Sequence, residues 1–167
     1  MDLKFDLASA NETIDLLKDL YPEAGSDPRE IAAKLFTDRN FVEPARFIAR
    51  AHSARDALTY RYSFSYRPQG NPRGKPASGP EVEFVFGTLG TETAGPFTYK
   101  DRETSNVMRA YWANFAKTGD PNEPGLPAWP RYSADEQILS ISNDGIFARR
   151  DPWTARLDRL ERQSESR

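Results

Sequence analysis

The stretch YWANFAKTGDPNEPGLPAWPRY, residues 111–132, decides how the carboxyl-terminal half of this chain is organised. It begins inside a helix predicted over residues 101–118 and continues as a connector with four prolines, which restrict the backbone before folding. Gly119 suits the left-handed position that often follows a helix, and Asp120-Pro121 then stops the helix. The apolar positions on one side of this helix are Val107, Met108, Tyr111, Trp112 and Phe115.

Two segments with strand patterns lie on either side of this stretch. Upstream, apolar and polar residues alternate from Leu58 to Tyr66, which predicts one sheet strand at about 58–66. Its aromatic side is expected to be a buried sheet face rather than a base-stacking platform. Downstream, Asn143-Asp144-Gly145 lies between two apolar runs and predicts a small β-hairpin at about 138–148. A single strand and a separate hairpin do not make a self-contained sheet, so we expect the rest of the sheet elsewhere.

The segments outside these strands are predicted to be helices and one loop. Ser9 and Glu12 have capping-box spacing before a helix that stops at Pro22, and Asp27 is expected to cap a second helix. Residues 68–80, PQGNPRGKPASGP, are predicted to be a loop that leads to the segment EVEFVFG. On the second helix, Ile31 and Leu35 are expected to face inward. A third helix is predicted from Phe41, Phe47 and Ile48, and Pro44 is expected to kink or interrupt it. A last helix is predicted to begin at Asp151-Pro152 and to bury Trp153, Leu157 and Leu160.

Composition indicates a folded chain with a thin aliphatic core. Leu, Ile, Val and Phe together number 32 of 167 residues, while 20 aromatic residues add burial capacity. The net charge of −2 drives no expansion and gives no support for nucleic acid or an anionic membrane as partner. Such a core suits a piece that packs against more protein.

Residue usage leaves the cellular compartment unknown. The absence of cysteine excludes disulfides and thiolate metal sites, but does not exclude an oxidising compartment. No apolar run approaches the roughly 18 residues of a membrane-spanning helix. The start MDLKFDLASANETIDLL has no signal-peptide core either.

Four segments in order resemble the type-B carboxylesterase family, which includes para-nitrobenzyl esterases and cholinesterases. Residues 111–132 are similar to the family's YW-x-NFAKTGDPN and W-P-x-Y segments. The other three are TDRNFVEPARFIARAHS (37–53), LTYRYSFSY (58–66) and EVEFVFGTL (81–89), similar to a family helix, a late sheet strand and the E-I-P-Y-V-F-G segment.

This resemblance implies an α/β fold. The chain would be the carboxyl-terminal portion of an α/β-hydrolase, with residues 1–167 forming a single partial domain, about the last third of a family member. A complete relative would hydrolyse carboxylic esters through an acyl-serine intermediate, with no metal or organic cofactor.

The residues needed for that chemistry are missing from this sequence. Acyl transfer needs a serine on a G-x-S-x-G elbow, a histidine base and an acid, and no G-x-S-x-G occurs here. Where the resemblance implies the histidine of H-G-x-E, the chain reads Ser78-Gly79-Pro80-Glu81, so Ser78 occupies the base position. A hydroxyl is not basic near neutral pH. Glu81 flanks the position and is expected to hold the loop, and Glu83 replaces the family's proline.

His52 is the chain's single histidine, and we expect it to be a solvated or helix-terminal residue rather than a catalytic or metal-binding one. The sequence therefore predicts a carboxylesterase-like segment with no catalytic residue, inactive by itself. The alternative is a non-catalytic binding or structural module. Its partner would be the amino-terminal esterase portion or a second, self-associating copy.

Overall fold

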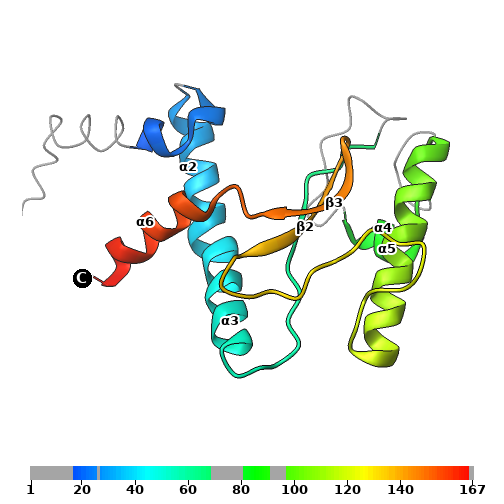
Figure 1. Ribbon diagram of the computed structural model, residues 1–167. Helices are drawn as coiled ribbons and strands as arrows, with labels where there is room; N and C mark the ends of the chain where they lie inside the picture. Colours follow the sequence, from blue (N-terminus) through cyan, green and yellow to red (C-terminus); the bar gives the residue numbers. More distant parts are fainter. Residues whose placement is uncertain (1–16, 26, 69–80, 91–96, 166–167) are drawn as a thin grey trace, which may run out of the picture. The chain divides into compact units, whose positions relative to one another are not determined.

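The computed structural model describes residues 17–25, 27–68, 81–90 and 97–165 (Figure 1). The chain divides into two compact units, one formed by Met1–Ile48 with Pro152–Arg167 and the other by Ala49–Asp151. Each is described separately below. The predicted helix between Ser9 and Pro22 lies mostly outside the described residues, as does the loop at 68–80.

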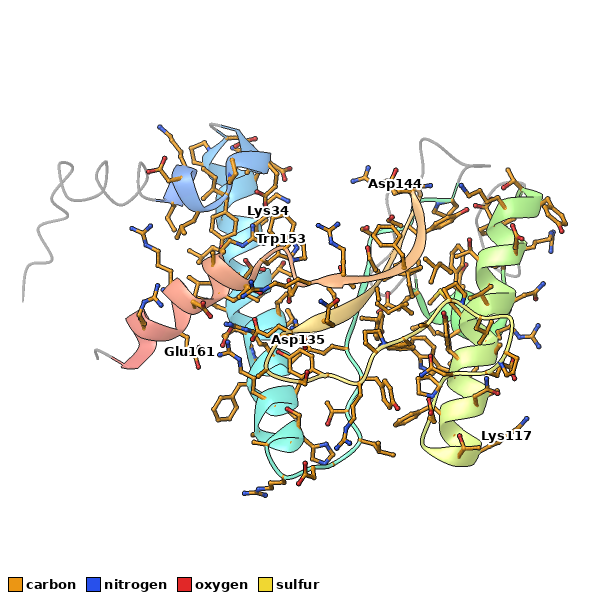
Figure 2. All side chains as sticks on the ribbon, in the orientation of Figure 1. Lys34, Lys117, Asp135, Asp144, Trp153 and Glu161 are labelled. Atoms are coloured by element: carbon orange, nitrogen blue, oxygen red, sulfur yellow. The ribbon has the colours of Figure 1, made fainter. Side chains whose placement is uncertain are left out.

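A three-stranded sheet forms the centre of the second unit. Its strands are β1 (Tyr62–Phe64), β2 (Gln137–Ser142) and β3 (Gly145–Arg150), in the order β1-β2-β3. β2 and β3 make the predicted antiparallel hairpin, with Ser142 opposite Gly145 across the turn. Figure 2 shows Asp144 at the tip of this hairpin. The hairpin prediction is therefore confirmed, with each strand slightly longer than expected.

The expectation that the strand and the hairpin stand apart is wrong. β1 pairs with β2 in parallel, with Tyr62 opposite Leu139 and Phe64 opposite Ile141. Parallel neighbours need a long crossover between them, so no local sequence pattern reports their pairing. β1 is also shorter than the predicted 58–66, because the Thr59 carbonyl bonds to the amide of Tyr132 in the connector rather than to β2.

Two helices pack against this sheet on the aromatic side of β1. α4 (Glu81–Phe86) and α5 (Tyr99–Thr118) contact each other, as Figure 1 shows. The apolar core that they share with the sheet contains Tyr66, Phe84, Met108, Tyr111, Trp129, Leu139 and Ile141. Of the aromatic side predicted to be buried, Tyr66 lies in this core and Phe64 packs against it partly buried, whereas Tyr62 is 36% exposed, so the prediction holds for only part of the strand.

α5 begins and ends through identifiable local chemistry. Thr98 and Asp101 form a capping box, so α5 begins at Tyr99, two residues before the predicted start at residue 101. Gly119 ends the helix with φ of 78°. Met108 and Tyr111 are fully buried as expected. Phe115 remains 47% exposed, because it lies near the end of the helix and only its edge meets Tyr60.

A long helical run begins in the first unit, and the last residues of its final helix, from Ala49, belong to the second. After the short 3-10 turn η1 (Pro22–Ala24), α2 (Pro28–Thr37) passes through a π-helical turn, η2 (Asp38–Val42), into α3 (Glu43–Ser53). Asp27 caps α2 through the amide of Arg29, as predicted. The predicted interruption at Pro44 is absent, because the run continues through it. The π-helical turn η2 lies directly before the proline, with the Glu43 amide bonded to the Asp38 carbonyl.

α6 (Thr154–Glu165) lies beside α2 and α3 within this unit, as seen in Figure 1. Leu157 and Leu160 are buried, as expected. Trp153 is 36% exposed, which contradicts its predicted burial. Its ring is covered on one side by the Arg156 guanidinium, 4.1 Å from the ring centre, so it stacks on a cation instead of entering an apolar core.

Among the helices of the described part, none combines the length and apolar character needed to cross a bilayer.

Candidate functional site

The sequence places the candidate site at the loop that precedes α4. Ser78, the residue expected at the base position, lies outside the described residues, so its surroundings stay a prediction. Glu81 is described and begins α4 with its side chain partly buried. Burial raises the pKa of Tyr62, and the nearby Glu81 charge raises it further. Glu81 therefore lies near the aromatic face of β1, at the end of the loop that carries position 78.

α4 is held in place by its packing against β1 and α5. Phe84 is buried, with its ring 5.5 Å from Phe64 and 5.4 Å from Tyr66 between centroids. The Ser105 hydroxyl of α5 donates a 2.7 Å hydrogen bond to the Phe84 carbonyl. These contacts fix the helix onto which the loop leads.

The start of α5 is joined to the same aromatic face by a buried hydrogen bond. The Tyr66 hydroxyl donates to Asp101 Oδ1 at 2.8 Å, while the Thr98 amide donates to Asp101 Oδ2 at 2.7 Å. Burial raises the pKa of Tyr66 to about 12, and the bond to Asp101 adds to this by favouring the protonated phenol. One carboxylate therefore caps the helix and anchors the sheet at the same time.

His52 contacts a threonine rather than a catalytic partner. Its Nδ1 lies 3.0 Å from the Thr59 hydroxyl, which itself donates to the Ala57 carbonyl at 3.1 Å. Neither a serine nor a carboxylate takes part in this contact. The helix-terminal interpretation of His52 is consistent with its place near the end of α3.

Sequence reasoning did not foresee a buried ion cluster between α3 and α6. Arg46 is fully buried, with Nη1 at 3.3 Å from Glu43 and 3.7 Å from Glu161, and Nη2 pairs with Asp158. An arginine in an otherwise amphipathic helix is the signal that was available. It reveals a buried charge only once Asp158 and Glu161 of α6, more than 100 residues away, are known to lie beside it.

A second buried cluster surrounds Arg156 of α6. Arg156 Nη1 lies 2.6 Å from Glu23, and its Nε lies 2.7 Å from Asp38 Oδ2, a distance typical of an ion pair although the alignment is not that of a hydrogen bond. Burial raises the pKa of Asp38, and the Arg156 charge opposes this rise. Burial, followed by the Asp38 charge, also raises the pKa of Tyr21. Figure 2 shows Trp153, whose ring contacts Arg156, where the chain enters α6.

A third charged cluster lies in the second unit. Glu136 is buried and accepts a 2.7 Å hydrogen bond from Arg50 Nε, and its backbone has a positive φ of 54°. Arg61 pairs with buried Asp151 at 2.9 Å. Each acidic group has a basic partner, which is the arrangement of structural ion pairs rather than of a free general acid or base.

No group of three or more His, Cys, Asp or Glu side chains suited to a metal ion occurs among the residues that the structure describes. The described part does contain buried ion pairs and stacked aromatic rings.

Comparison with known proteins identifies the family. Residues 8–158 match the model of the carboxylesterase family. The human cocaine esterase is 35% identical over 136 residues, which are 77% of this chain and 24% of that protein. Carboxylesterase 5A of Canis lupus familiaris is 37% identical over 145 residues, which are 78% of this chain and 25% of that protein. The chain belongs to the carboxylesterase family.

A solved structure supports the same fold. The carboxylesterase of Geobacillus stearothermophilus, determined at pH 6.2, superposes with a TM-score of 0.69 and 29% sequence identity. The match covers 90% of this chain and 33% of that one. The helix-rich chain with its three-stranded mixed sheet thus matches part of a carboxylesterase α/β-hydrolase, and it spans about a quarter of the length of its curated relatives.

Proposed function

We propose that this polypeptide is a carboxyl-terminal scaffold segment of a carboxylesterase-like protein and hydrolyses no ester by itself. The observation that carries the proposal is Ser78-Gly79-Pro80-Glu81 at the place of the family's H-G-x-E, in a chain without G-x-S-x-G. Residues 1–167 would then form one partial domain. The family reaction, hydrolysis of carboxylic esters, would belong to longer members.

The chemical reason lies in proton transfer. An attacking serine hydroxyl must give its proton to a base whose pKa lies near the working pH, and imidazole meets this condition. The Ser78 hydroxyl cannot replace it, because protonation of an alcohol is negligible near neutral pH. His52 is the only imidazole in the sequence, and its Nδ1 contacts the Thr59 hydroxyl.

The scaffold around the loop supports a structural role. α4 keeps its hydrogen bond to Ser105 and its buried Phe84, although position 78 carries no base. These contacts of α4 depend on residues other than Ser78, which supports a structural role for the segment.

An ester hydrolysis assay tests the proposal. We expect the purified chain to hydrolyse para-nitrophenyl acetate no faster than buffer, and the Ser78→Ala variant to behave identically. A wild-type rate clearly above both buffer and Ser78→Ala would show that Ser78 acts as a nucleophile and would overturn the proposal.

A second candidate is a non-catalytic module that binds another copy of itself. The favouring observation is the exposure of large apolar side chains, including Phe86 at 71% and Tyr99 at 83%. Size-exclusion chromatography with light scattering tests whether the chain is such a self-associating module. A compact monomer over a wide concentration range argues against self-association, and a stable dimer favours it.

A further inference from the structure

The guanidinium of Arg156 is held by aromatic rings as well as by charges. Its Cζ lies 4.5 Å from the ring centre of Tyr21 and 4.1 Å from that of Trp153. Both distances are inside the limit of about 6 Å for a cation–π contact. Its Nη1 lies 2.6 Å from Glu23, and its Nε lies 2.7 Å from Asp38. Two rings and two carboxylates around one cation form the kind of cage that recognises cationic ligands.

This cage is buried and joins segments that are far apart in the sequence. All five residues belong to the first unit, and Glu23 and Arg156 are 133 residues apart. Tyr21 is the residue before η1, and Asp38 begins η2, whereas Trp153 lies where the chain enters α6 (Figure 2). Tyr21 is 0% exposed, Asp38 4% and Arg156 8%. The contacts of Arg156 therefore tie the start of α6 to residues 21–38.

Three buried polar atoms of the cage lack an aligned hydrogen-bond partner. They are Tyr21 Oη, Asp38 Oδ2 and Arg156 Nε, and they make up the whole set of such side-chain atoms found within the described residues. Native proteins rarely leave buried polar groups in this state. Arg156 Nε is close enough to Asp38 for an ion pair, but its side chain is tethered to α6. A free guanidinium ion has no tether and is able to turn until its donors meet the carboxylates.

The chemistry of the cage favours a guanidinium over an ammonium ion. A guanidinium is flat and weakly hydrated, so it contacts a ring with its face while donors on different nitrogens meet different carboxylates. Arg156 does this with Nη1 towards Glu23 and Nε towards Asp38. An ammonium ion is more strongly hydrated and carries all its donors on one nitrogen, so it gains less from entering such a site.

We propose that Tyr21, Glu23, Asp38 and Trp153 form a guanidinium-binding site, and that Arg156 is its tethered ligand, which latches α6 to residues 21–38. The native occupant thus comes from the same chain. When its side chain is removed, the site binds free guanidinium ion. This inference goes beyond the proposed function, because it does not depend on whether the chain hydrolyses esters.

Chemical rescue of Arg156→Ala in the full chain tests the site. Amide hydrogen exchange in α6 reports the latch, and it is measured with guanidinium chloride at millimolar concentration, far below the molar range in which this salt denatures proteins. Methylammonium chloride and sodium chloride at the same ionic strength are the ligand controls. The control variant is Arg162→Ala, which removes an exposed arginine from the same helix.

We expect exchange in α6 to be at least about tenfold faster in Arg156→Ala than in the wild type, because two buried carboxylates lose their cation. Guanidinium should slow this exchange by at least about threefold and in a saturable way, as a ligand that binds the folded state does. Methylammonium and sodium should not slow it. The wild type, whose site is filled, and Arg162→Ala should not respond to guanidinium.

Trp153→Leu provides a second test that does not depend on how well Arg156→Ala folds. Trp153 is 36% exposed, so the variant is expected to fold. It removes one ring of the site while the charge of Arg156 and both carboxylates remain. Exchange in α6 should become about threefold faster, as expected for the loss of one cation–π contact.

Four results would overturn the proposal. They are unchanged exchange in α6 for Arg156→Ala, no slowing by guanidinium, equal slowing by methylammonium, and unchanged exchange for Trp153→Leu. If Arg156→Ala is unfolded alone, guanidinium should restore its far-UV circular dichroism, and failure to do so counts as the absence of rescue. Ester hydrolysis by the isolated chain would refute the proposed scaffold role and would leave the guanidinium-binding site unaffected.

Discussion

Replacing Arg46 by methionine tests whether a buried ion cluster holds α3 to α6. The guanidinium is fully buried and meets carboxylates from both helices, Glu43 on α3 and Asp158 and Glu161 on α6. Methionine keeps much of the side-chain length without the charge. The substitution removes the guanidinium that these three carboxylates share.

The expected loss can be worked out from the exposure of these groups. Removing one partner of a buried ion pair costs about 3–5 kcal/mol. The side chains of Glu43, Glu161 and Asp158 are 15%, 31% and 36% exposed, so water partly rehydrates them once the arginine is gone. We therefore expect the lower end, about 3 kcal/mol. With a urea m-value of about 2 kcal/mol/M, the unfolding midpoint should fall by about 1.5 M.

Urea unfolding followed by far-UV circular dichroism measures this loss, and hydrogen exchange of α6 amides locates it. The control is Arg39→Met, at an exposed position of the same helical run, where a change within about 0.5 kcal/mol is expected. Exchange in α6 should accelerate for Arg46→Met and remain unchanged for the control. Equal midpoints for the two variants would show that the cluster contributes nothing net, and the reasoning would be refuted.

Three further predictions concern the second unit. Gly119→Ala should lower stability by about 1–2 kcal/mol in thermal unfolding, because an L-residue at φ of 78° is strained. Equal melting temperatures would contradict this. Ser105→Ala should cost about 1–2 kcal/mol and speed amide exchange in α4, since the buried Phe84 carbonyl loses its 2.7 Å donor; unchanged exchange would count against the anchoring role. In the folded chain the pKa of Tyr66 is raised to about 12, whereas in the unfolded chain the phenol has its ordinary pKa of about 10. As the pH rises, the unfolded chain therefore loses the phenol proton before the folded chain does. The contribution of Tyr66 to stability should be complete below about pH 10 and should fall between about pH 10 and 12. Tyr66→Phe should flatten that fall, and an unchanged slope would exclude Tyr66 as its source.

Much of the local structure could be predicted because its causes are local. Asp27 caps α2, Gly119 ends α5 and the Asn143-Asp144 turn joins β2 to β3, each through contacts within a few residues. The periodicity of α5 likewise identified Met108 and Tyr111 as buried. The errors arose where a distant partner decided the outcome.

Trp153 illustrates such an error, because its apolar character favoured burial. The structure instead stacks its ring on Arg156, which also pairs with Asp38 and Glu23. The preference of a residue type for the core is an average over environments, and a cation held nearby by other charges changes it. The candidate site was foreseen only in part, since Glu81 is placed at the start of α4 while Ser78 lies outside the described residues.

Residue types alone were enough to show the carboxylesterase resemblance, the ends of two helices and the hairpin, and to predict that Ser78 stands where the family has its histidine. These depend on residue types at short spacing, which a linear chain displays directly. The three-dimensional arrangement was needed to show that β1 joins β2 in one sheet, that Arg46 is buried among carboxylates, and that Phe47 and Ile48 of α3 are exposed. Each of these outcomes depends on groups brought together across many residues, where the cost of closing the loop is weighed against contacts that no local pattern encodes.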